Sequence, residues 1–349
     1  MTEGVTIAQT DLLCANCAGQ CVFAPQTGTL TCLRCASEHV IWIDPEADPS
    51  AEQHYHPDLP HTEQPRFTRN RPHQCQTCGG EVVFLGHSIS EACPYCEGSL
   101  IEKAEDESYE ALGVIPFAVS DEQAQINAQA WVDGRWAAPS DLGAVVAQSR
   151  VAGIYVPFWT FDSHEAVKYT VKYKVRSGKR SISKTYKSAM STQFDDLLAP
   201  ASPHVTPLIR DGILHDFDPG TLRPFEPAYL AGFAAEFHHQ SVKEGLKHNE
   251  ADKALLLRNR IKMHSRKSNI TNVTYVTDTT GIRYRRVLLP VWILHYSHQG
   301  KPMKVVTCGL RGRTFGERPF STLKLFGFAV LASCAVTAFG VAWGASGIF

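Results

Sequence analysis

The chain has 349 residues, of which 44% are hydrophobic and 20% are charged. This length and composition are typical of a folded protein with two or more domains, and they exclude a collagen-like or fully disordered chain. The formal net charge of −1 conceals a division, since residues 1–150 carry 21 acidic and 7 basic residues (net −14), whereas residues 151–349 carry 14 and 27 (net +13).

The basic C-terminal half favours contact with an anionic surface such as the inner leaflet of a membrane; two solvated domains of opposite charge that attract each other are the alternative. The first eleven residues contain no basic region and no long apolar run, so we expect no signal peptide. The eleven cysteines are therefore expected in a reducing compartment, where Cys-x-x-Cys pairs bind metal more often than they form disulfides.

The first hundred residues contain the same cysteine motif twice, and each copy has two Cys-x-x-Cys pairs separated by fourteen residues. Four thiolates on two facing turns suit tetrahedral zinc, and units this small need the metal to fold. The motif predicts two zinc ribbons with one Zn²⁺ each; redox pairs or disulfides are the alternative. Loss of one ligand, as in Cys78→Ser, is expected to unfold only its own ribbon. The predicted ligands are Cys14, Cys17, Cys32 and Cys35 in ribbon 1, and Cys75, Cys78, Cys93 and Cys96 in ribbon 2.

The charge of the ribbons argues against nucleic acid. Residues 11–44 contain three acidic and one basic residue, and residues 73–102 contain four acidic residues and no Lys or Arg. Affinity for nucleic acid depends on cations that neutralise phosphates. We therefore expect protein-binding or structural ribbons. Cys21 lies close enough in sequence to replace a ligand of ribbon 1, or it packs as a spare thiol.

Between ribbon 1 (residues 1–44) and ribbon 2 (73–104), residues 45–72 are rich in proline and predict a linker. Four histidines in or beside it could bind metal weakly, but a solvated tether is favoured: His54, His56, His61 and His73.

Residues 105–322 predict a β-rich α+β domain. Ser120 and Gln123 form a capping-box pattern for a helix that runs to about Val132 and stops near Gly134. Strands are expected at 153–161, 167–175, 182–188, 272–277, 282–296 and 303–308. Residues 224–265 are expected to be mainly helical, as one or two helices that open at Pro227 and carry the solvated histidines His238, His239 and His248. The similar motifs Val156-Pro-Phe-Trp159 and Leu289-Pro-Val-Trp292 suggest an internal duplication with both tryptophans in the core.

The predicted hairpin at residues 166–188 has two different faces. Val167, Tyr169 and Val171 alternate with residues that include Lys168 and Lys172, the pattern of a half-buried strand. The basic face could bind anionic lipid or an acidic partner; edge-strand lysines that prevent aggregation are the alternative.

Residues 325–349 contain no charged side chain. A helix of this length is about 37 Å long, enough to cross a hydrocarbon core of about 30 Å, so we predict a transmembrane helix at 323–349. The preceding flank is basic, which favours a tail anchor with the remaining residues on the cytoplasmic side. A buried soluble helix is the alternative, although the four glycines of this stretch are more common in membranes.

Motifs of common enzyme classes are absent from the sequence: there is no phosphate-binding Gly-x4-Gly-Lys-Ser/Thr loop, no Gly-x-Gly-x-x-Gly after a strand, and no Gly-x-Ser-x-Gly elbow. We therefore expect no catalytic residues and no organic cofactor.

Several motifs in their order resemble a bacterial family of tandem zinc-ribbon membrane proteins, often labelled primosomal protein N′ (replication factor Y) or superfamily II helicase. After the ribbons, they are Ile115-Pro-Phe117, Gly134-Arg-Trp-Ala-Ala-Pro-Ser-Asp141, Gly153-Ile-Tyr-Val-Pro-Phe-Trp-Thr-Phe161, Phe194-Asp-Asp196, Tyr229-Leu-Ala-Gly-Phe-Ala-Ala-Glu236, Leu289-Pro-Val-Trp292 and Gly316-Glu-Arg-Pro-Phe-Ser321. Ala18 and Glu97 depart from the glycine common after a zinc knuckle. The helicase label conflicts with the missing ATP-binding motif.

The resemblance implies a scaffold role, because relatives are encoded beside SPFH-domain (flotillin-like) and PspA-type membrane-stress proteins. The sequence and the resemblance together predict a non-enzymatic adaptor in the bacterial inner membrane that recruits such proteins, with oligomerisation left open. A replication or transcription factor that binds DNA through its ribbons is the alternative, against which the acidic ribbons argue.

Overall fold

The computed structural model describes residues 12–48, 51–56, 66–67, 72–85, 92–103, 107–109, 111–178 and 180–345. Within these ranges the chain is a β-rich α+β protein with two four-cysteine clusters near its N-terminus and one long apolar helix near its C-terminus. The predicted fold class is therefore confirmed. The predictions for residues 1–11, for linker residues 49–50, 57–65 (with His61) and 68–71, for Lys179 and for residues 346–349 lie outside the described residues.

Two very long strands form the centre of the main sheet. Strand β11 (Arg150–Ser177) pairs antiparallel with β15 (Ile270–His298) from Arg150 opposite His295 to Tyr173 opposite Ile270. On the other side of β11 lies β12 (Arg180–Pro200), and β16 (Lys301–Cys308) and β17 (Thr314–Gly316) follow beyond β15. Two short strands, β10 (Gly113–Val114) and β13 (Arg223–Pro224), extend the sheet beside β15.

The central part of the sheet is buried on both faces, because consecutive side chains of β11 point into different cores. Ile154, Val156 and Phe158 belong to one core, with α3 (Pro207–Leu214) and ribbon 2. Tyr155 belongs to the other core, with α1 (Asp121–Asp133), α2 (Leu142–Ala147) and ribbon 1. The two Val/Leu-Pro-x-Trp motifs lie in these neighbouring strands, with Pro157 opposite Leu288 and Pro290 opposite Tyr155.

Helix α1 forms as predicted. The Ser120 hydroxyl accepts a hydrogen bond from the Gln123 backbone N–H, and Gly134 is the C-cap. Ala124, Ala128 and Val132 face the core at helical spacing. The N-cap and the end of the helix near Gly134 are therefore confirmed.

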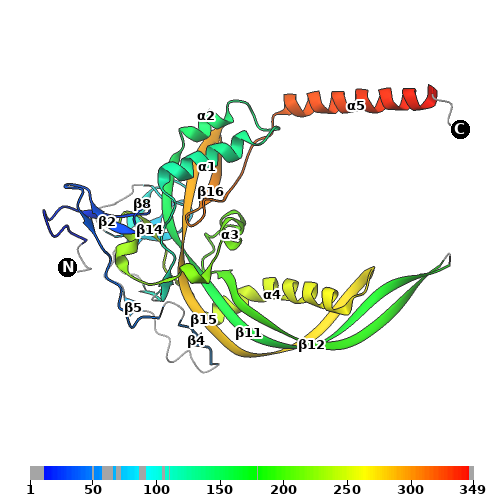
Figure 1. Ribbon diagram of the computed structural model, residues 1–349, viewed down its shortest axis with the longest axis horizontal. Helices are drawn as coiled ribbons and strands as arrows, with labels where there is room; N and C mark the ends of the chain where they lie inside the picture. The colour runs from blue at the N-terminus through cyan, green and yellow to red at the C-terminus, as the bar shows by residue number, and fades with distance from the viewer. Residues whose placement is uncertain are drawn as a thin grey trace.

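The outer parts of β11, β12 and β15 leave the core as a three-stranded layer that curves around α4 (Figure 1). We call residues 163–178, 180–198 and 270–282 the blade. The pairing shifts by one residue between Phe161 and Ser163, and such a bulge bends a strand where the blade begins. The predicted alternation holds, since Val167 and Val171 are buried whereas Lys168 and Lys172 are exposed.

Helix α4 (Val242–Ser265) covers the inner face of the blade. Its Leu257 and Ile261 pack against Val167, Tyr169 and Val171. A complete capping box between Ser241 and Glu244 fixes its start.

The prediction of a mainly helical segment over 224–265 is wrong for its first half, which contains only the short turn η3 (Pro227–Leu230) and strand β14 (Ala234–Ala235). Gly232 adopts φ +90°, which ends any helix there. Leu230 and Phe233 are apolar because they fill the core beside ribbon 1, not because they form a helical stripe.

The prediction of solvated helix histidines is wrong for His238, which precedes α4. Its side chain is fully buried, Nε2 lies 2.9 Å from the carbonyl oxygen of Phe158, and burial lowers its pKa to about 3. His239 and His248 are exposed, as expected.

Helix α5 (Thr322–Ala345) projects away from the body (Figure 1). Its first turns are held by the α1–α2 connection: Ser321 N–H donates to Ala137 O at 2.8 Å, Lys324 Nζ to Ala138 O at 2.7 Å, and the Phe328 ring lies 5.2 Å from that of Trp136. The span Thr322–Trp343 has a mean hydropathy of 2.1, and its most apolar stretch is not buried at all. It is therefore long and apolar enough to cross a membrane, and no described part of the chain covers it.

Candidate metal centres

All four Cys-x-x-Cys turns have the same backbone hydrogen bonds. In each turn the first cysteine donates its N–H to the carbonyl five residues on, at 2.6–2.9 Å, and its carbonyl accepts the N–H four residues on, at 2.8–2.9 Å. The four turns start at Cys14, Cys32, Cys75 and Cys93. This repeated geometry turns both sulfur atoms of each pair to the same side.

The residue after each pair adopts a left-handed backbone, with φ between 53° and 77° at Ala18, Ala36, Gly79 and Glu97. Only Gly79 takes this conformation without a steric cost. The departures from glycine at Ala18 and Glu97 therefore leave the turns intact, and the metal-binding geometry forms with the residues present.

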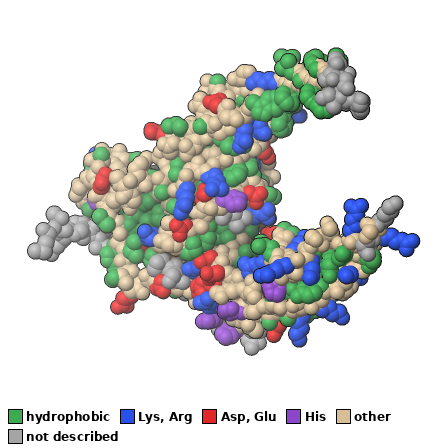
Figure 2. Space-filling view, turned by 45° about the vertical axis from the view of Figure 1, so that its right-hand side comes forward, with side chains coloured by type: hydrophobic (Ala, Val, Ile, Leu, Met, Phe, Trp, Pro, Cys, Tyr) green, Lys and Arg blue, Asp and Glu red, His purple; other side chains and the backbone are tan. Residues whose placement is uncertain are grey.

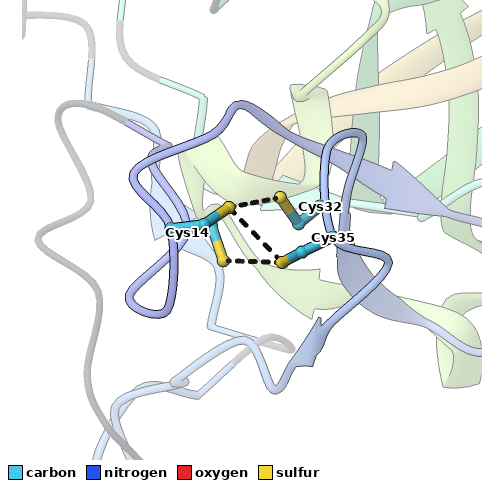
Figure 3. Close-up of side chains that lie close together, drawn as sticks. Cys14, Cys32 and Cys35 are labelled. Atoms are coloured by element: carbon cyan, nitrogen blue, oxygen red, sulfur yellow. Dashed lines mark hydrogen bonds between the residues drawn. The ribbon is translucent and has the colours of Figure 1, made fainter.

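Ribbon 1 consists of β1 (Cys21–Ala24), β2 (Thr29–Cys32) and β3 (Glu38–His39) with its two turns. Sulfur–sulfur distances are 3.6 Å for Cys14–Cys35, 3.5 Å for Cys17–Cys32 and 3.4 Å for Cys17–Cys35, and Figure 3 shows how the side chains converge. Zn–S bonds of about 2.3 Å place the sulfur atoms of a tetrahedral site about 3.8 Å apart. The donor set and its spacing thus fit zinc.

Hydrogen bonds lower the pKa of Cys32 and Cys35. The pKa of Cys17 is raised, since the lowering effect of the Gly19 N–H is outweighed by hydrogen bonds to neighbouring sulfur atoms and by burial. The N–H groups of Asn16 and Arg34 lie 3.4 Å from the sulfur atoms of Cys14 and Cys32. The Ser37 hydroxyl and backbone lower the pKa of Cys35 to about 6. A metal ligand must be deprotonated, so these bonds assist binding.

Ribbon 2 consists of β6 (Pro72–Cys75), β7 (Glu81–Phe84) and β8 (Leu100–Glu102). Its sulfur–sulfur distances are 3.5 Å for Cys75–Cys96 and 3.8 Å for Cys78–Cys93. Unlike ribbon 1, it continues the main sheet, because β7 pairs with β14 and β14 pairs with β11. All eight predicted ligands are therefore brought together in two groups, as expected.

Two further contacts anchor ribbon 2 to the domain. The Tyr95 hydroxyl, between ligands Cys93 and Cys96, donates to the buried carboxylate of Glu236, which also accepts from Ser202 Oγ at 2.6 Å. His295 Nε2 lies 2.8 Å from Pro94 O. Burial raises the pKa of Glu236 to about 7, against the lowering effect of its two hydrogen bonds.

A residue that the sequence analysis missed lies beside the first centre. His39 Nε2 is 3.2 Å from Cys14 Sγ. The sulfur atoms of Cys14 and Cys21 and a ring nitrogen of His39 all lie within 4.8 Å of one another, close enough to share a metal ion. Cys21 is buried in β1. The available signal was the position of His39, four residues after the last cysteine in a strand that pairs with β2.

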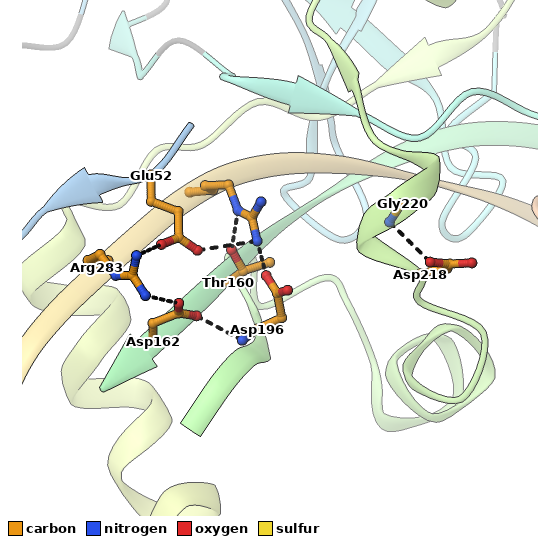
Figure 4. A network of polar contacts seen from close by, with 8 residues as sticks. Glu52, Thr160, Asp162, Asp196, Asp218, Gly220 and Arg283 are labelled. Atoms are coloured by element: carbon orange, nitrogen blue, oxygen red, sulfur yellow. Dashed lines mark hydrogen bonds and ion pairs between the residues drawn. The ribbon is translucent and has the colours of Figure 1, made fainter. Parts of the chain in front are cut away.

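A third group of acidic residues joins Glu52, Asp162 and Asp196 (Figure 4). Arginines compensate its charge: Arg283 lies 2.9 Å from both Glu52 and Asp162, and Arg285 pairs with Asp196 and lies 3.4 Å from Glu52. The group is therefore an ion-pair network rather than a cation site.

The network ties residues 51–56 to the sheet, where β4 (Gln53–His54) pairs with β15. This part of the predicted linker is thus packed and not a free tether. Among the described residues of the linker, neither His54 nor His56 belongs to a group that could hold a metal ion.

A partly open cavity of about 660 Å³ lies between α4 and the blade, lined by Phe161, Leu246, Leu257 and Tyr275 among others. Close to it, the fully buried Glu165 accepts hydrogen bonds from Thr277 and Thr279 at 2.7 Å and pairs with Lys253 at 2.5 Å. Burial raises its pKa, but these bonds outweigh burial and hold the pKa below its ordinary value. The carboxylate of Glu165 is thus fully hydrogen-bonded, whereas Oδ1 of the buried Asn249, which also lines the cavity, has no hydrogen-bond partner among the described residues.

Comparison with known proteins adds one relative. No protein-family model and no solved structure matches the chain. The chain is 26% identical over 233 residues to a Bacillus subtilis (strain 168) protein named "Uncharacterized protein YdjG". The match covers 61% of this chain and 64% of the relative, so the chain spans less than two-thirds of that protein's length. The name of the relative assigns no activity.

Proposed function

We propose that this protein is a non-enzymatic adaptor, anchored in the bacterial inner membrane by α5, with the zinc ribbons on the cytoplasmic side. The observation that carries the proposal is the uncovered apolar helix on a body that also holds two four-cysteine sites. An apolar surface of this size is unfavourable in water and stable in lipid. The cations nearest the helix, Arg318 and Lys324, favour a cytoplasmic flank.

Ribbon 1 supplies a surface for a protein partner. Leu33, Val40 and Trp42 are exposed by 70%, 85% and 53%, while the ribbon lacks the cations that nucleic acid requires. The family resemblance supports an SPFH-domain or PspA-like protein as the partner. The two sites bind Zn²⁺ and act structurally, because four thiolate ligands leave no open position for a substrate.

The anchor is tested by fractionating cells that express the full chain. We expect the protein in membranes that resist carbonate extraction, with the ribbons digested by protease only in inverted vesicles. Recovery in the soluble fraction would contradict the anchor, and digestion in right-side-out vesicles would contradict its orientation.

The partner is tested by cross-linking detergent-solubilised membranes with Trp42→benzoylphenylalanine. An adduct with an SPFH-domain or PspA-like protein supports the adaptor role, and the matched variant Trp136→benzoylphenylalanine, beside α5, should not give it. Failure to recover such an adduct, together with salt-sensitive DNA binding that depends on the ribbon cysteines, would favour the DNA-binding alternative.

A further inference from the structure

The outer part of the blade and the end of α4 contain basic residues without acidic ones. No Asp or Glu occurs in residues 166–178, 180–194 or 262–277. Figure 2 shows Lys and Arg side chains gathered over this end of the molecule. All the described cations here are exposed except Lys267, which is half-buried. They are Lys168, Lys172, Lys174, Arg176, Arg180, Lys184, Lys187, Lys262, Arg266 and Lys267.

Three of these cations line one cavity at the blade tip. Gly178, at φ +60°, lies in the turn between β11 and β12, so that Arg176 pairs with Ser181 and Lys174 with Ser183. An open cavity of about 520 Å³ results, lined by Lys174, Arg176, Arg180, Ser181, Asn269, Ile270 and Thr271. Guanidinium, ammonium, hydroxyl and amide groups without a carboxylate are the donors that bind phosphate.

The position of the tip relative to α5 favours a membrane surface. In Figure 1, a straight line can be drawn from the start of α5 to the blade tip, with α5 on one side and the other labelled elements on the opposite side. If the surface of a bilayer follows this line, α5 enters the bilayer and the blade tip touches its surface. The cations also lie on both faces of the tip, since Lys184 is opposite Tyr173 and Lys174, next to Tyr173, points to the other face. The tip can therefore contact several phosphates at once.

We propose that the blade tip binds the phosphate groups of anionic phospholipids in the same bilayer that α5 spans. The inference rests on the proposed membrane anchor and adds a second contact to it. Each Lys or Arg close to an anionic leaflet strengthens binding about fivefold, so the cations of the cavity alone supply a strong preference for anionic lipid. Salt weakens this contact but not the insertion of α5.

The test uses the full chain in nanodiscs of phosphatidylcholine, with or without about one-third phosphatidylglycerol. The variant Ile182→benzoylphenylalanine places a photo-cross-linker on β12 beside Arg180, where the side chain is 48% exposed. We expect lipid adducts, detected by mass, in the anionic discs and at least a tenfold loss in the neutral discs. The triple change Lys174→Glu, Arg176→Glu and Arg180→Glu should cause a similar loss.

Two controls separate this inference from the anchor. The matched triple change Lys243→Glu, Lys247→Glu and Lys301→Glu alters net charge equally at exposed positions elsewhere and should leave the adducts unchanged. Leu331→benzoylphenylalanine in α5 should give lipid adducts in every disc. Adducts at Leu331 but none at Ile182, or Ile182 adducts equal in neutral discs, would overturn the inference and leave the anchor intact. No adduct at Leu331 would overturn the anchor. Ile182 adducts formed in cells with protein or nucleic acid in place of lipid would also overturn the inference.

Discussion

Three of the four Cys-x-x-Cys turns contain a non-glycine residue in a strained backbone conformation. Ala18, Ala36 and Glu97 adopt left-handed φ values that cost non-glycine residues about 1–2 kcal/mol each. The cost is tolerated because the paired backbone hydrogen bonds determine the turn. A metal held by the four cysteines would offset part of this cost.

The change Glu97→Gly should raise the affinity of the second site for zinc about two- to fivefold, because relief of the strain exceeds the extra entropy of glycine in the unfolded chain by about 0.5–1 kcal/mol. Chelator competition on the purified protein measures the affinity. Glu97→Ala is the control, since it removes the charge but keeps the backbone cost. Equal affinities for the Gly and Ala variants would rule out this explanation.

The contact between Tyr95 and Glu236 makes stability depend on pH. Because burial raises the folded-state pKa of Glu236 above its unfolded value, its contribution is fully present below the unfolded pKa and is lost as pH rises through about 7. The Tyr95 hydroxyl limits that loss, since it hydrogen-bonds the charged carboxylate.

Tyr95→Phe should therefore lower the stability of the zinc-loaded protein by about 1–3 kcal/mol at pH 8.5 and by less at pH 6. Thermal unfolding at the two pH values measures the difference. The control Tyr173→Phe removes a hydroxyl on the blade. It should leave the midpoint of thermal unfolding nearly unchanged at both pH values. A deficit that is the same at both pH values would show that the charge of Glu236 is not involved.

Residue-level reasoning from the sequence succeeds where the signal is local. The eight ligands were predictable because spacing alone defines two facing pairs. The partner of Tyr95 was not, since Glu236 lies 141 residues away. Nor was the burial of His238, because only the folded arrangement places it against Phe158.

At the scale of elements, the sequence predicts the strands but underestimates their length. Segments expected at 153–161 and 167–175 are one strand, β11. The first segment is apolar except for Thr160 because both its faces are buried, and the second alternates because one face is exposed. The pattern changes at the bulge beside Asp162, and periodicity cannot show that the strand continues.

The two ribbons differ in how they join the rest of the molecule. Ribbon 1 forms its own sheet and contacts the domain through the Phe23 side chain and its N–H bond to Ala231 O. Ribbon 2 is part of the main sheet through β7 and β14. From the sequence alone, Cys78→Ser is expected to unfold only its own ribbon. With the pairing through β14, we expect it to disturb the main sheet as well.

Cys17→Ser and Cys78→Ser should each reduce bound zinc from two ions to one, but only Cys78→Ser should speed hydrogen exchange of β11 amides at 150–158. The reason is that β7 of ribbon 2 pairs with β14, and β14 pairs with Ile154 and Tyr155 of β11. Elemental analysis and exchange mass spectrometry provide the two measurements. Equal exchange in both variants would mean that ribbon 1 is coupled to the sheet as strongly as ribbon 2.

At the scale of the whole molecule, acidic ribbons and a basic blade lie at different ends of the described structure (Figures 1 and 2). An anionic leaflet attracts the blade and repels the ribbons. If α5 spans a bilayer as proposed, the charge division favours an orientation in which the ribbons face away from that bilayer.

Leu331→Arg should decrease the membrane-bound fraction at least tenfold, because a cation at the centre of a transmembrane helix costs about 2.5–3.5 kcal/mol. The matched control is Leu255→Arg, which makes the same change at an exposed position of α4 and should leave the protein in the membrane. Carbonate extraction and immunoblotting measure both. Unchanged retention of Leu331→Arg would contradict insertion of α5.

The unbroken course of β11 has a mechanical consequence. Its 28 residues follow a curved path from beside ribbon 2 to the blade tip, and an extended strand rises about 3.3 Å per residue, so about 90 Å of continuous strand joins the two ends. Hydrogen bonds to β15 along nearly the whole strand resist further bending. A force applied at the tip would thus act as a torque on the distant end that carries the four-cysteine clusters.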